Sequence, residues 1–342
     1  MHVLALTQGD PAGVGPEIVL RAAAGRDASW IPLLVAEEAA IGAARAILPL
    51  GLVARLVRVE SSSLRSAHGR QQLEALAPGS LPWVDPVGVP RVVQLGQPDA
   101  ADARGALAAI DLGLELVVAG VADALVTAPV SKAIIDRFAA PGFRGHTDYL
   151  AHALGCARYG RDYLMAFLAD DLRVALLTVH QPLREALDSI DRQRVAEALV
   201  LLARCAPRAP GAGLPRIALA GLNPHAGEGG LLGREEIEVL APAVAEARRL
   251  GVDVTGPESP DTVFLRARRG EFDWVLALYH DQGLIAVKTL SFGGATNVTL
   301  GLPILRTSVD HGTAYALAGT GRADAGPMER ALATTIELIG NR

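Results

Sequence analysis

The sequence predicts an α/β fold built from two lobes. Strand-like apolar runs alternate with helix-like segments from the N-terminus onward, which is the pattern of a parallel sheet covered by helices. Half of the 342 residues are hydrophobic and only 4% are aromatic, so the core is aliphatic. Because a single core stops growing near about 250 to 300 residues, the length favours two lobes.

The N-terminal segment reads as a strand, a turn and a helix. His2–Thr7 is strand-like, Gln8–Gly13 is a turn, and a helix begins near Pro16. Proline suits the first helical position, and Glu17 lies in the first turn, where the helix dipole favours an anion. Gly25 follows the last apolar turn and predicts the helix end.

Later segments continue the alternation. The predicted strands are Trp30–Ala36, Val53–Val59, Ala124–Thr127, Leu172–His180, Arg216–His225 and Phe272–His280. The predicted helices cover residues 37–47, 103–119, 191–205 and 235–250. Between Ser61 and Asp102 the pattern weakens into polar and glycine-rich sequence, and Pro207–Pro215 reads as a surface connection.

Composition excludes several classes of protein. The net charge is −5 and no basic run occurs, which argues against nucleic acid as a partner. Cys156 and Cys205 lack metal-binding or disulfide-framework spacing. The sequence shows neither a signal peptide nor a membrane-spanning apolar run. We therefore expect a cytoplasmic protein that acts on small molecules.

Three strand-like runs end on His180, His225 and His280. A lone histidine after a strand is more often a hydrogen-bonded loop residue than a ligand. In an open parallel sheet, however, ligands bind outside the carboxyl ends of the strands, so three such residues are expected to converge on one metal. Imidazole is the commonest protein ligand for transition metals. One lobe is expected to carry all three.

Lys288, Asn297 and Arg306 follow these histidines and supply cationic and amide donors for an anionic substrate. Taken alone, Lys288 also fits a surface lysine. The chain nevertheless contains only two lysines, Lys132 and Lys288, against thirty arginines, which favours a specific role for Lys288. His146 and Thr147 fit either simple helix capping or an anion site at a helix N-terminus, and the sequence supports both readings equally.

Glycine motifs do not match the common nucleotide fingerprints. The Gly13–Ile18 segment lacks the third glycine of the dinucleotide motif, and no phosphate-loop GK[ST] motif occurs. The C-terminal stretch His311–Gly321 contains three glycines, which permit close backbone approach to a flat ligand. A plain glycine-rich turn is the alternative.

Long motifs follow one another along nearly the whole chain. They are LTQGDPAGVGPE (Leu6–Glu17), GHTDY (Gly145–Tyr149), LNPHAGEGG (Leu222–Gly230), SPDTVF (Ser259–Phe264), YHDQG with its lysine (Tyr279–Lys288) and NVTLGLPILRTSVDHGTA (Asn297–Ala314). Together they closely resemble the 4-hydroxythreonine-4-phosphate dehydrogenase family of vitamin B6 biosynthesis. The last motif also resembles the adenine-binding loop of isocitrate and isopropylmalate dehydrogenases, to whose wider fold this family belongs.

The resemblance implies two α/β/α lobes with a central cleft. Residues 1–140 and 300–342 would form a nucleotide-binding lobe, and residues 141–299 a lobe for metal, substrate and dimer contacts. It implies a divalent metal (Zn, Mg, Co or Mn) bound by His180, His225 and His280 from both subunits of a homodimer, which replaces the expectation that one lobe suffices. The implied substrate-binding residues are His146, Thr147, Lys288, Asn297 and Arg306, and the implied NAD or NADP residues are His311, Gly312, Ala314 and Gly319.

The implied reaction oxidises the alcohol of 4-phosphooxy-L-threonine. The metal activates the hydroxyl, hydride passes to NAD(P), and the 2-amino-3-oxo acid loses CO2 to give 3-amino-2-oxopropyl phosphate. Lys288 is expected to act either as an acid/base or as a charge clamp, and Asp261 is a further candidate near the site.

One stretch departs from the family pattern. After YHDQG the chain reads LIAVKTLSFGGATN, where members associated with the B6 pathway tend to read LPVLKY. Threonate or erythronate phosphates and aromatic cis-dihydrodiol dicarboxylates therefore remain alternative substrates. A phosphate acyltransferase of the same wider fold and a non-catalytic metabolite-binding protein are alternatives from other classes.

Overall fold

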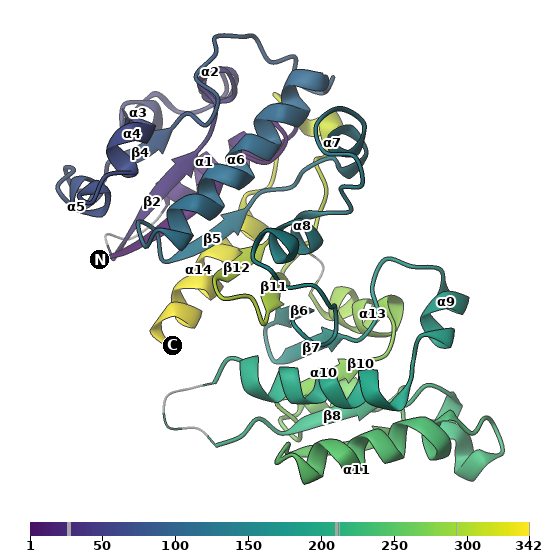
Figure 1. Cartoon of the computed structure of the whole chain (residues 1–342). Coiled ribbons are helices and arrows are strands. Elements are labelled where there is room, and N and C mark those ends of the chain that lie inside the picture. The colour runs from purple at the N-terminus through teal and green to yellow at the C-terminus, as the bar shows by residue number, and fades with distance from the viewer. Residues whose placement is uncertain (26–28, 209–210, 212, 292, 342) are drawn as a thin grey trace. The chain divides into compact units, whose positions relative to one another are not determined.

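The computed structural model describes residues 1–25, 29–208, 211, 213–291 and 293–341. It divides into two compact units, which Figure 1 shows as α/β structures. The first unit comprises Met1–Leu150 and Ile304–Gly340, and the second comprises Ala151–Pro303. The α/β fold class predicted from the sequence is confirmed.

The first unit is built on a parallel sheet. Its strands are β1 (His2–Thr7), β2 (Trp30–Val35), β3 (Leu56–Arg58), β4 (Leu81–Val84), β5 (Ala124–Thr127) and β12 (Leu305–Ser308), in the spatial order β3-β4-β2-β1-β5-β12. Its helices are α1 (Gly15–Ala24), α2 (Glu38–Arg45), α3 (Leu50–Val53), α4 (Ser61–Leu64), α5 (Gly69–Glu74), α6 (Ala100–Val118), α7 (Lys132–Phe138), α14 (Gly326–Gly340) and the short 3-10 turn η3 (Tyr315–Leu317). Helix α8 (His146–Ala153) begins in this unit and continues into the next.

Local sequence signals explain where the main helices of the first unit begin. Pro16 lies in the first turn of α1, and Glu17 stands near its N-terminus, as the sequence predicts. Asp99 caps α6 by accepting hydrogen bonds from the amides of Ala101 and Asp102, while the Asp102 carboxylate accepts from the Asp99 amide. This reciprocal capping box fixes the start of the longest helix of the unit.

The second unit is built on a mixed sheet. Its strands are β6 (Leu164–Ala169), β7 (Leu172–Leu176), β8 (Ile217–Ala220), β9 (Val254–Glu258), β10 (Trp274–Ala277) and β11 (Thr296–Leu300), in the order β11-β6-β7-β10-β8-β9. Its helices are α9 (Leu183–Asp188), α10 (Arg192–Cys205), α11 (Ala241–Arg249), α12 (Val263–Arg268) and α13 (His280–Leu290), with the turns η1 (Pro224–Gly230) and η2 (Glu236–Leu240). Strand β6 runs antiparallel to β7 and β11, whereas β7, β10, β8 and β9 are parallel.

The structure corrects several expected elements. The expected strand Val53–Val59 is short, because α3 occupies its first residue and β3 begins at Leu56. Residues 61–102, where the pattern weakens, contain two short helices and strand β4. The helix expected at 235–250 opens with a π-helical turn, η2, before α11. The Pro207–Pro215 connection lies partly outside the described residues.

The unit boundaries also differ from the expected lobes. Residues 141–150 belong to the first unit and residues 300–303 to the second. The first shift has a physical cause, because Thr147 on α8 hydrogen-bonds to Arg306 on β12. His146 and Thr147 therefore belong to the same unit as Arg306 and not to the unit that carries the three strand-end histidines.

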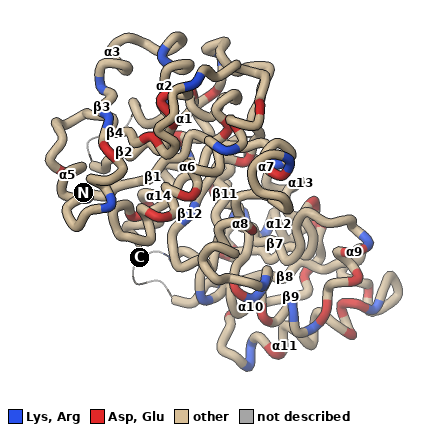
Figure 2. Tube along the Cα trace, turned by 45° about the horizontal axis from the view of Figure 1, so that its top comes forward, with Lys and Arg blue, Asp and Glu red and all other residues tan. Residues whose placement is uncertain are grey.

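Charged residues are distributed over both units. Figure 2 shows basic and acidic positions interspersed along the trace of each unit. Among the described residues, no helix combines the length and the apolarity needed to cross a membrane.

Candidate active site

The three predicted metal histidines follow three adjacent strands of the second unit. Strands β7, β10 and β8 are parallel neighbours in this order, so their carboxyl ends lie at one edge of the sheet. His180 follows β7, His280 begins α13 directly after β10, and His225 lies in η1 after β8. The strands are shorter than the apolar runs, so short loop segments separate the histidines from the last paired residues.

His180 and His280 lie next to each other. Their ring centres are 5.5 Å apart with an angle of 45° between the ring planes. Metal–nitrogen bonds of about 2.1 Å in tetrahedral geometry would separate two ligating rings by about 5.4 Å between centres, so the observed spacing suits one ion. The Nδ1 of His280 lies 2.7 Å from a carboxylate oxygen of Asp281, the arrangement that leaves Nε2 for a metal.

His225 lies in a segment with unusual backbone geometry. His225, Ala226, Gly227, Glu228 and Gly229 all have positive φ angles, between 45° and 80°. Left-handed backbone costs a residue with a Cβ roughly 1 to 2 kcal/mol, and such strain often marks functional segments. The side chain of His225 is exposed at the sheet edge and is therefore accessible to a metal ion.

The described residues do not gather three metal ligands at one point. Among the described residues, no three His, Cys, Asp or Glu side chains gather closely enough to hold one metal ion. The donor chemistry nevertheless fits a divalent metal. The rings of His180 and His280 have the spacing of two ligands of one ion, and a third imidazole follows the neighbouring strand.

A buried cationic cluster lies in the first unit. Arg306 on β12 is only 2% exposed and donates hydrogen bonds to the hydroxyls of Thr127, at 2.8 Å, and Thr147, at 3.3 Å. His146 is half-buried beside them, and its buried Nε2 has no hydrogen-bond partner among the described residues. Lys132 approaches the same place, since a Cβ on Gly145 would lie 3.7 Å from its Nζ. The cluster offers donors to an anion.

Burial controls the protonation of this cluster. Desolvation lowers the pKa of His146 well below its usual range, and the positive charges of Arg306 and Lys132 lower it further. His146 is therefore neutral at neutral pH. Burial also lowers the pKa of Arg306 to about 9, which leaves the guanidinium charged at neutral pH. The cluster thus combines a fixed cation with a neutral imidazole.

The predicted helix cap at Thr147 is not observed. Helix α8 already begins at His146, and the Thr147 hydroxyl accepts a hydrogen bond from Arg306. The sequence left capping and anion binding equally supported. In the structure the His146–Thr147 pair lies beside a buried cation, which is the environment that an anion site needs.

Lys288, Asn297 and Asp261 lie in the second unit. Lys288 is exposed in the last turn of α13, and Asn297 lies on β11 with its buried Oδ1 lacking a hydrogen-bond partner among the described residues. Asp261 accepts a hydrogen bond from Ser259 just before α12. The expected substrate residues are therefore divided between the two units.

The predicted cofactor loop packs against the N-terminal turn of the first unit. The Val14 amide donates to the Thr313 carbonyl at 3.0 Å, and the Tyr315 hydroxyl donates to the Asp10 carboxylate at 2.6 Å. Ala314 has a φ of 44°, a left-handed conformation that shapes the start of η3. Gly319 has a φ of 76°, a backbone conformation that favours glycine. His311 has a buried Nε2 without a hydrogen-bond partner among the described residues, beside exposed Gly312.

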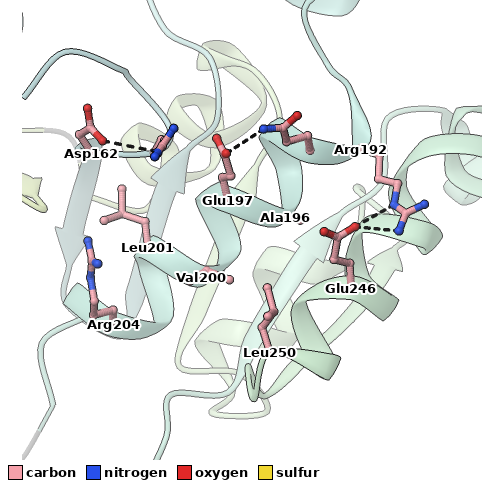
Figure 3. Close-up of a pocket in the computed structure, with 11 residues that line it drawn as sticks. Asp162, Arg192, Ala196, Glu197, Val200, Leu201, Arg204, Glu246 and Leu250 are labelled. Carbon is pink, nitrogen blue, oxygen red and sulfur yellow. Dashed lines mark hydrogen bonds and ion pairs between the residues drawn. The ribbon is translucent and has the colours of Figure 1, made fainter.

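A wide hollow elsewhere in the second unit lacks these features. It has a volume of about 700 Å³ and lies between α10 and α11. Figure 3 shows the pair of Arg192 with Glu246, whose atoms approach to 2.8 Å. Glu197 also accepts a hydrogen bond from Gln193 at 3.0 Å. The candidate histidines do not line it.

The sequence reasoning missed residues that support the candidate ones. Thr127 ends a predicted strand but belongs to no motif, and its contact with Arg306 joins residues far apart in the chain. The rarity of lysine in the chain could have indicated Lys132, which is one of only two lysines. Glu236 and Gln282 lie near His225 and His280 and bond to the backbone of neighbouring loops.

Comparisons with known proteins identify the family of the chain. The family model described as pyridoxal phosphate biosynthetic protein PdxA matches residues 30–335. A 4-hydroxythreonine-4-phosphate dehydrogenase from Chromobacterium violaceum is 42% identical over 99% of this chain and 97% of its own. A D-threonate 4-phosphate dehydrogenase from Salmonella typhimurium is 37% identical over 98% of each chain.

A solved structure shows the same fold. The crystal structure of 4-hydroxythreonine-4-phosphate dehydrogenase from Klebsiella pneumoniae matches with a TM-score of 0.83 and 35% identity, over 99% of this chain and 100% of that chain. The family match and these full-length similarities lead to one conclusion: the chain belongs to the PdxA family of pyridoxal phosphate biosynthetic proteins and is a homologue of its dehydrogenases.

Proposed function

We propose that this protein is a metal-dependent, NAD(P)-linked dehydrogenase that oxidises 4-phosphooxy-L-threonine in pyridoxal 5'-phosphate biosynthesis. The observation that carries the proposal is the combination of imidazoles at one sheet edge with a buried cationic cluster, in a chain similar over its whole length to 4-hydroxythreonine-4-phosphate dehydrogenases. The product would be a 2-amino-3-oxo acid, which loses CO2 to form 3-amino-2-oxopropyl phosphate.

Three histidines are the proposed metal ligands. His180, His225 and His280 would hold a divalent ion shared between two copies of the chain, with zinc, cobalt, manganese and magnesium as candidates. When bound, the metal supplies Lewis acidity that lowers the pKa of the substrate alcohol, and NAD(P) accepts the hydride.

Substrate recognition is assigned to the anion-binding residues. Arg306, Thr147 and His146 would bind an anionic group of the substrate, with the guanidinium supplying charge and the neutral imidazole a directed hydrogen bond. Asn297 would contribute an amide. Lys288 would act as an acid/base or as a charge clamp near the reacting carbon, and Asp261 is a weaker candidate.

Cofactor binding is assigned to the loop His311–Gly321. His311, Gly312, Ala314 and Gly319 would surround the adenosine portion of NAD or NADP. The support is local, because glycine and left-handed backbone leave the main chain accessible, and the buried Nε2 of His311 lacks a hydrogen-bond partner among the described residues.

The central test follows reduced nicotinamide by its absorbance. Purified protein with 4-phosphooxy-L-threonine, a divalent metal and NAD or NADP should form reduced cofactor, and a chelator should stop the reaction. The variant His225→Ala should lose metal by elemental analysis, while His152→Ala, on the exposed part of α8, should retain it. Full metal occupancy and turnover in His225→Ala would exclude its ligand role.

A second candidate substrate is D-threonate 4-phosphate. The similarity to the Salmonella typhimurium enzyme favours it, and so does the departure of residues 284–297 from the family pattern. Side-by-side assays with threonate and erythronate phosphates and with an aromatic cis-dihydrodiol dicarboxylate would rank the candidates by kcat/KM. Thioester-dependent release of coenzyme A without any nicotinamide requirement would instead favour a phosphate acyltransferase.

A further inference from the structure

A series of hydrogen bonds joins the three strand ends that carry the candidate metal histidines. The Thr178 hydroxyl, after β7, donates to the Leu278 carbonyl, after β10, at 2.9 Å. The Leu278 amide donates to Oε1 of Gln282 at 2.7 Å, and Nε2 of the same side chain donates to the Gly221 carbonyl, after β8, at 2.7 Å. We name these contacts of Thr178, Leu278, Gln282 and Gly221 the strand-end brace.

The strand-end brace joins the strands beyond the last residues that are paired in the sheet. The register between β10 and β8 ends at Leu276 and Leu219, and the register between β10 and β7 ends at Ala277 and Leu176. Beyond these residues the backbone groups need other partners, because unpaired buried amides and carbonyls are costly. Gln282 satisfies one amide and one carbonyl from two different strand ends and so fixes their separation.

The side chain at position 282 must be an amide to do this. Its oxygen accepts a hydrogen bond while its nitrogen donates one, and both bonds are at 2.7 Å. An ionised glutamate can only accept, so it would face the Gly221 carbonyl with a negative oxygen. A leucine of similar size would leave both backbone groups without this partner.

A second contact holds the loop that carries His225. The Glu236 carboxylate, 3% exposed, accepts from the amides of Leu222 at 2.8 Å and Asn223 at 2.7 Å. A Cβ on Gly227 would lie 2.7 Å from the same carboxylate, so the left-handed turn closes tightly around it. Gly221, which belongs to the strand-end brace, directly precedes the loop that Glu236 holds.

We propose that Gln282 is a positioning residue for the metal site, acting through the strand ends that carry His280 and His225. The inference rests on the proposed function, because it assumes that these histidines bind a metal. A site shared between two copies of the chain is especially sensitive to such positioning, since an error in strand-end spacing is introduced by each copy. Residues that orient metal ligands typically change metal affinity about 10- to 100-fold when replaced.

The test measures metal affinity directly. Metal-free full-length protein is titrated with Zn²⁺ or Co²⁺ in competition with a chromophoric chelator, and thermal unfolding is followed by circular dichroism. Gln282→Leu should bind the metal about 10- to 100-fold more weakly while it remains folded at the titration temperature. Gln282→Glu keeps the acceptor for the Leu278 amide but places a negative oxygen against the Gly221 carbonyl, so it should also weaken binding. Gln193→Leu, in the hollow between α10 and α11, is the matched control and should bind like the wild type.

The outcomes separate the inference from the proposed function. If the wild type binds the metal and His225→Ala does not, but Gln282→Leu binds within twofold of the wild type, the positioning role is wrong and the metal site stands. If the wild type itself binds no metal, the proposed function fails and the inference fails with it. Should Gln282→Leu not fold, Gln282→Glu removes only the bond to the Gly221 carbonyl; it should weaken binding measurably, and unchanged binding would overturn the proposal.

Discussion

Replacing Arg306 with methionine is expected to stabilise the protein while it removes substrate binding. The guanidinium is 2% exposed, and burial lowers its pKa from 12.5 to about 9. For a base with a lowered pKa, the folded state binds the proton less well than the unfolded state. The buried charge therefore costs stability at neutral pH, and stability rises as the pH increases from about 9 toward 12.5.

The magnitude follows from these shifts and from the hydrogen bonds. One pKa unit corresponds to about 1.4 kcal/mol, so the shift from 12.5 to about 9 corresponds to about 5 kcal/mol. Methionine recovers this cost but loses the bonds to Thr127 and Thr147, which contribute about 1.5 kcal/mol each. The net expectation is a gain of about 2 kcal/mol, or about 3 to 5 °C in Tm.

The assay measures Tm with and without added phosphate, and kcat/KM for the substrate. Arg306→Met should melt above the wild type in the absence of ligand, should no longer gain Tm on adding phosphate, and should lose about 100-fold or more in kcat/KM. The control Arg161→Met removes an exposed arginine in the second unit and should change neither quantity. A variant that is less stable than the wild type, yet still protected by phosphate, would refute the reasoning.

The remaining predictions concern pH, the cofactor loop and the metal. Because the pKa of His146 lies well below 6.5 in the folded protein, the unfolded state takes up the extra proton on acidification; wild-type stability should fall below about pH 6.5, and His146→Gln should flatten that part of a Tm-against-pH curve. Tyr315→Phe removes the bond to Asp10 and should raise KM for NAD(P) about 3- to 10-fold with little change in kcat, whereas an unchanged KM would separate this contact from cofactor binding. Removal of metal by a chelator should abolish turnover reversibly, and restored turnover on adding Zn²⁺, Co²⁺, Mn²⁺ or Mg²⁺ would rank the metals.

Local sequence signals were sufficient for much of the fold. The strand at Ala124–Thr127 and the helix that follows Asp191 match the expected residues, because apolar runs and capping side chains act over short distances. Strand β4 was missed, since it is short and contains Pro82, both weak strand signals. Strand β6 was not predicted either, and its antiparallel direction could not be, because an apolar run does not encode the direction of its neighbour.

The candidate site was predictable in its residue types but not in its supporting contacts. Strand-end histidines stand out in the sequence because each follows a buried run. The bond between Arg306 and Thr127, and the bridge from Gln282 to Gly221, join residues whose proximity depends on the strand order. The left-handed turn at His225 was equally inaccessible, since nonglycine residues occupy most such angles only where surrounding contacts impose them.

Because the chain contains only two lysines, amine-selective chemistry can modify individual, identifiable positions. Lys132, beside the buried cationic cluster, is the only lysine of the first unit, and exposed Lys288 on α13 is the only lysine of the second. An amine-selective reagent therefore meets just one side chain in each unit, apart from the N-terminus. Because Lys288 is a proposed substrate-binding residue, a loss of its labelling on adding substrate can be followed without interference from another lysine of its unit.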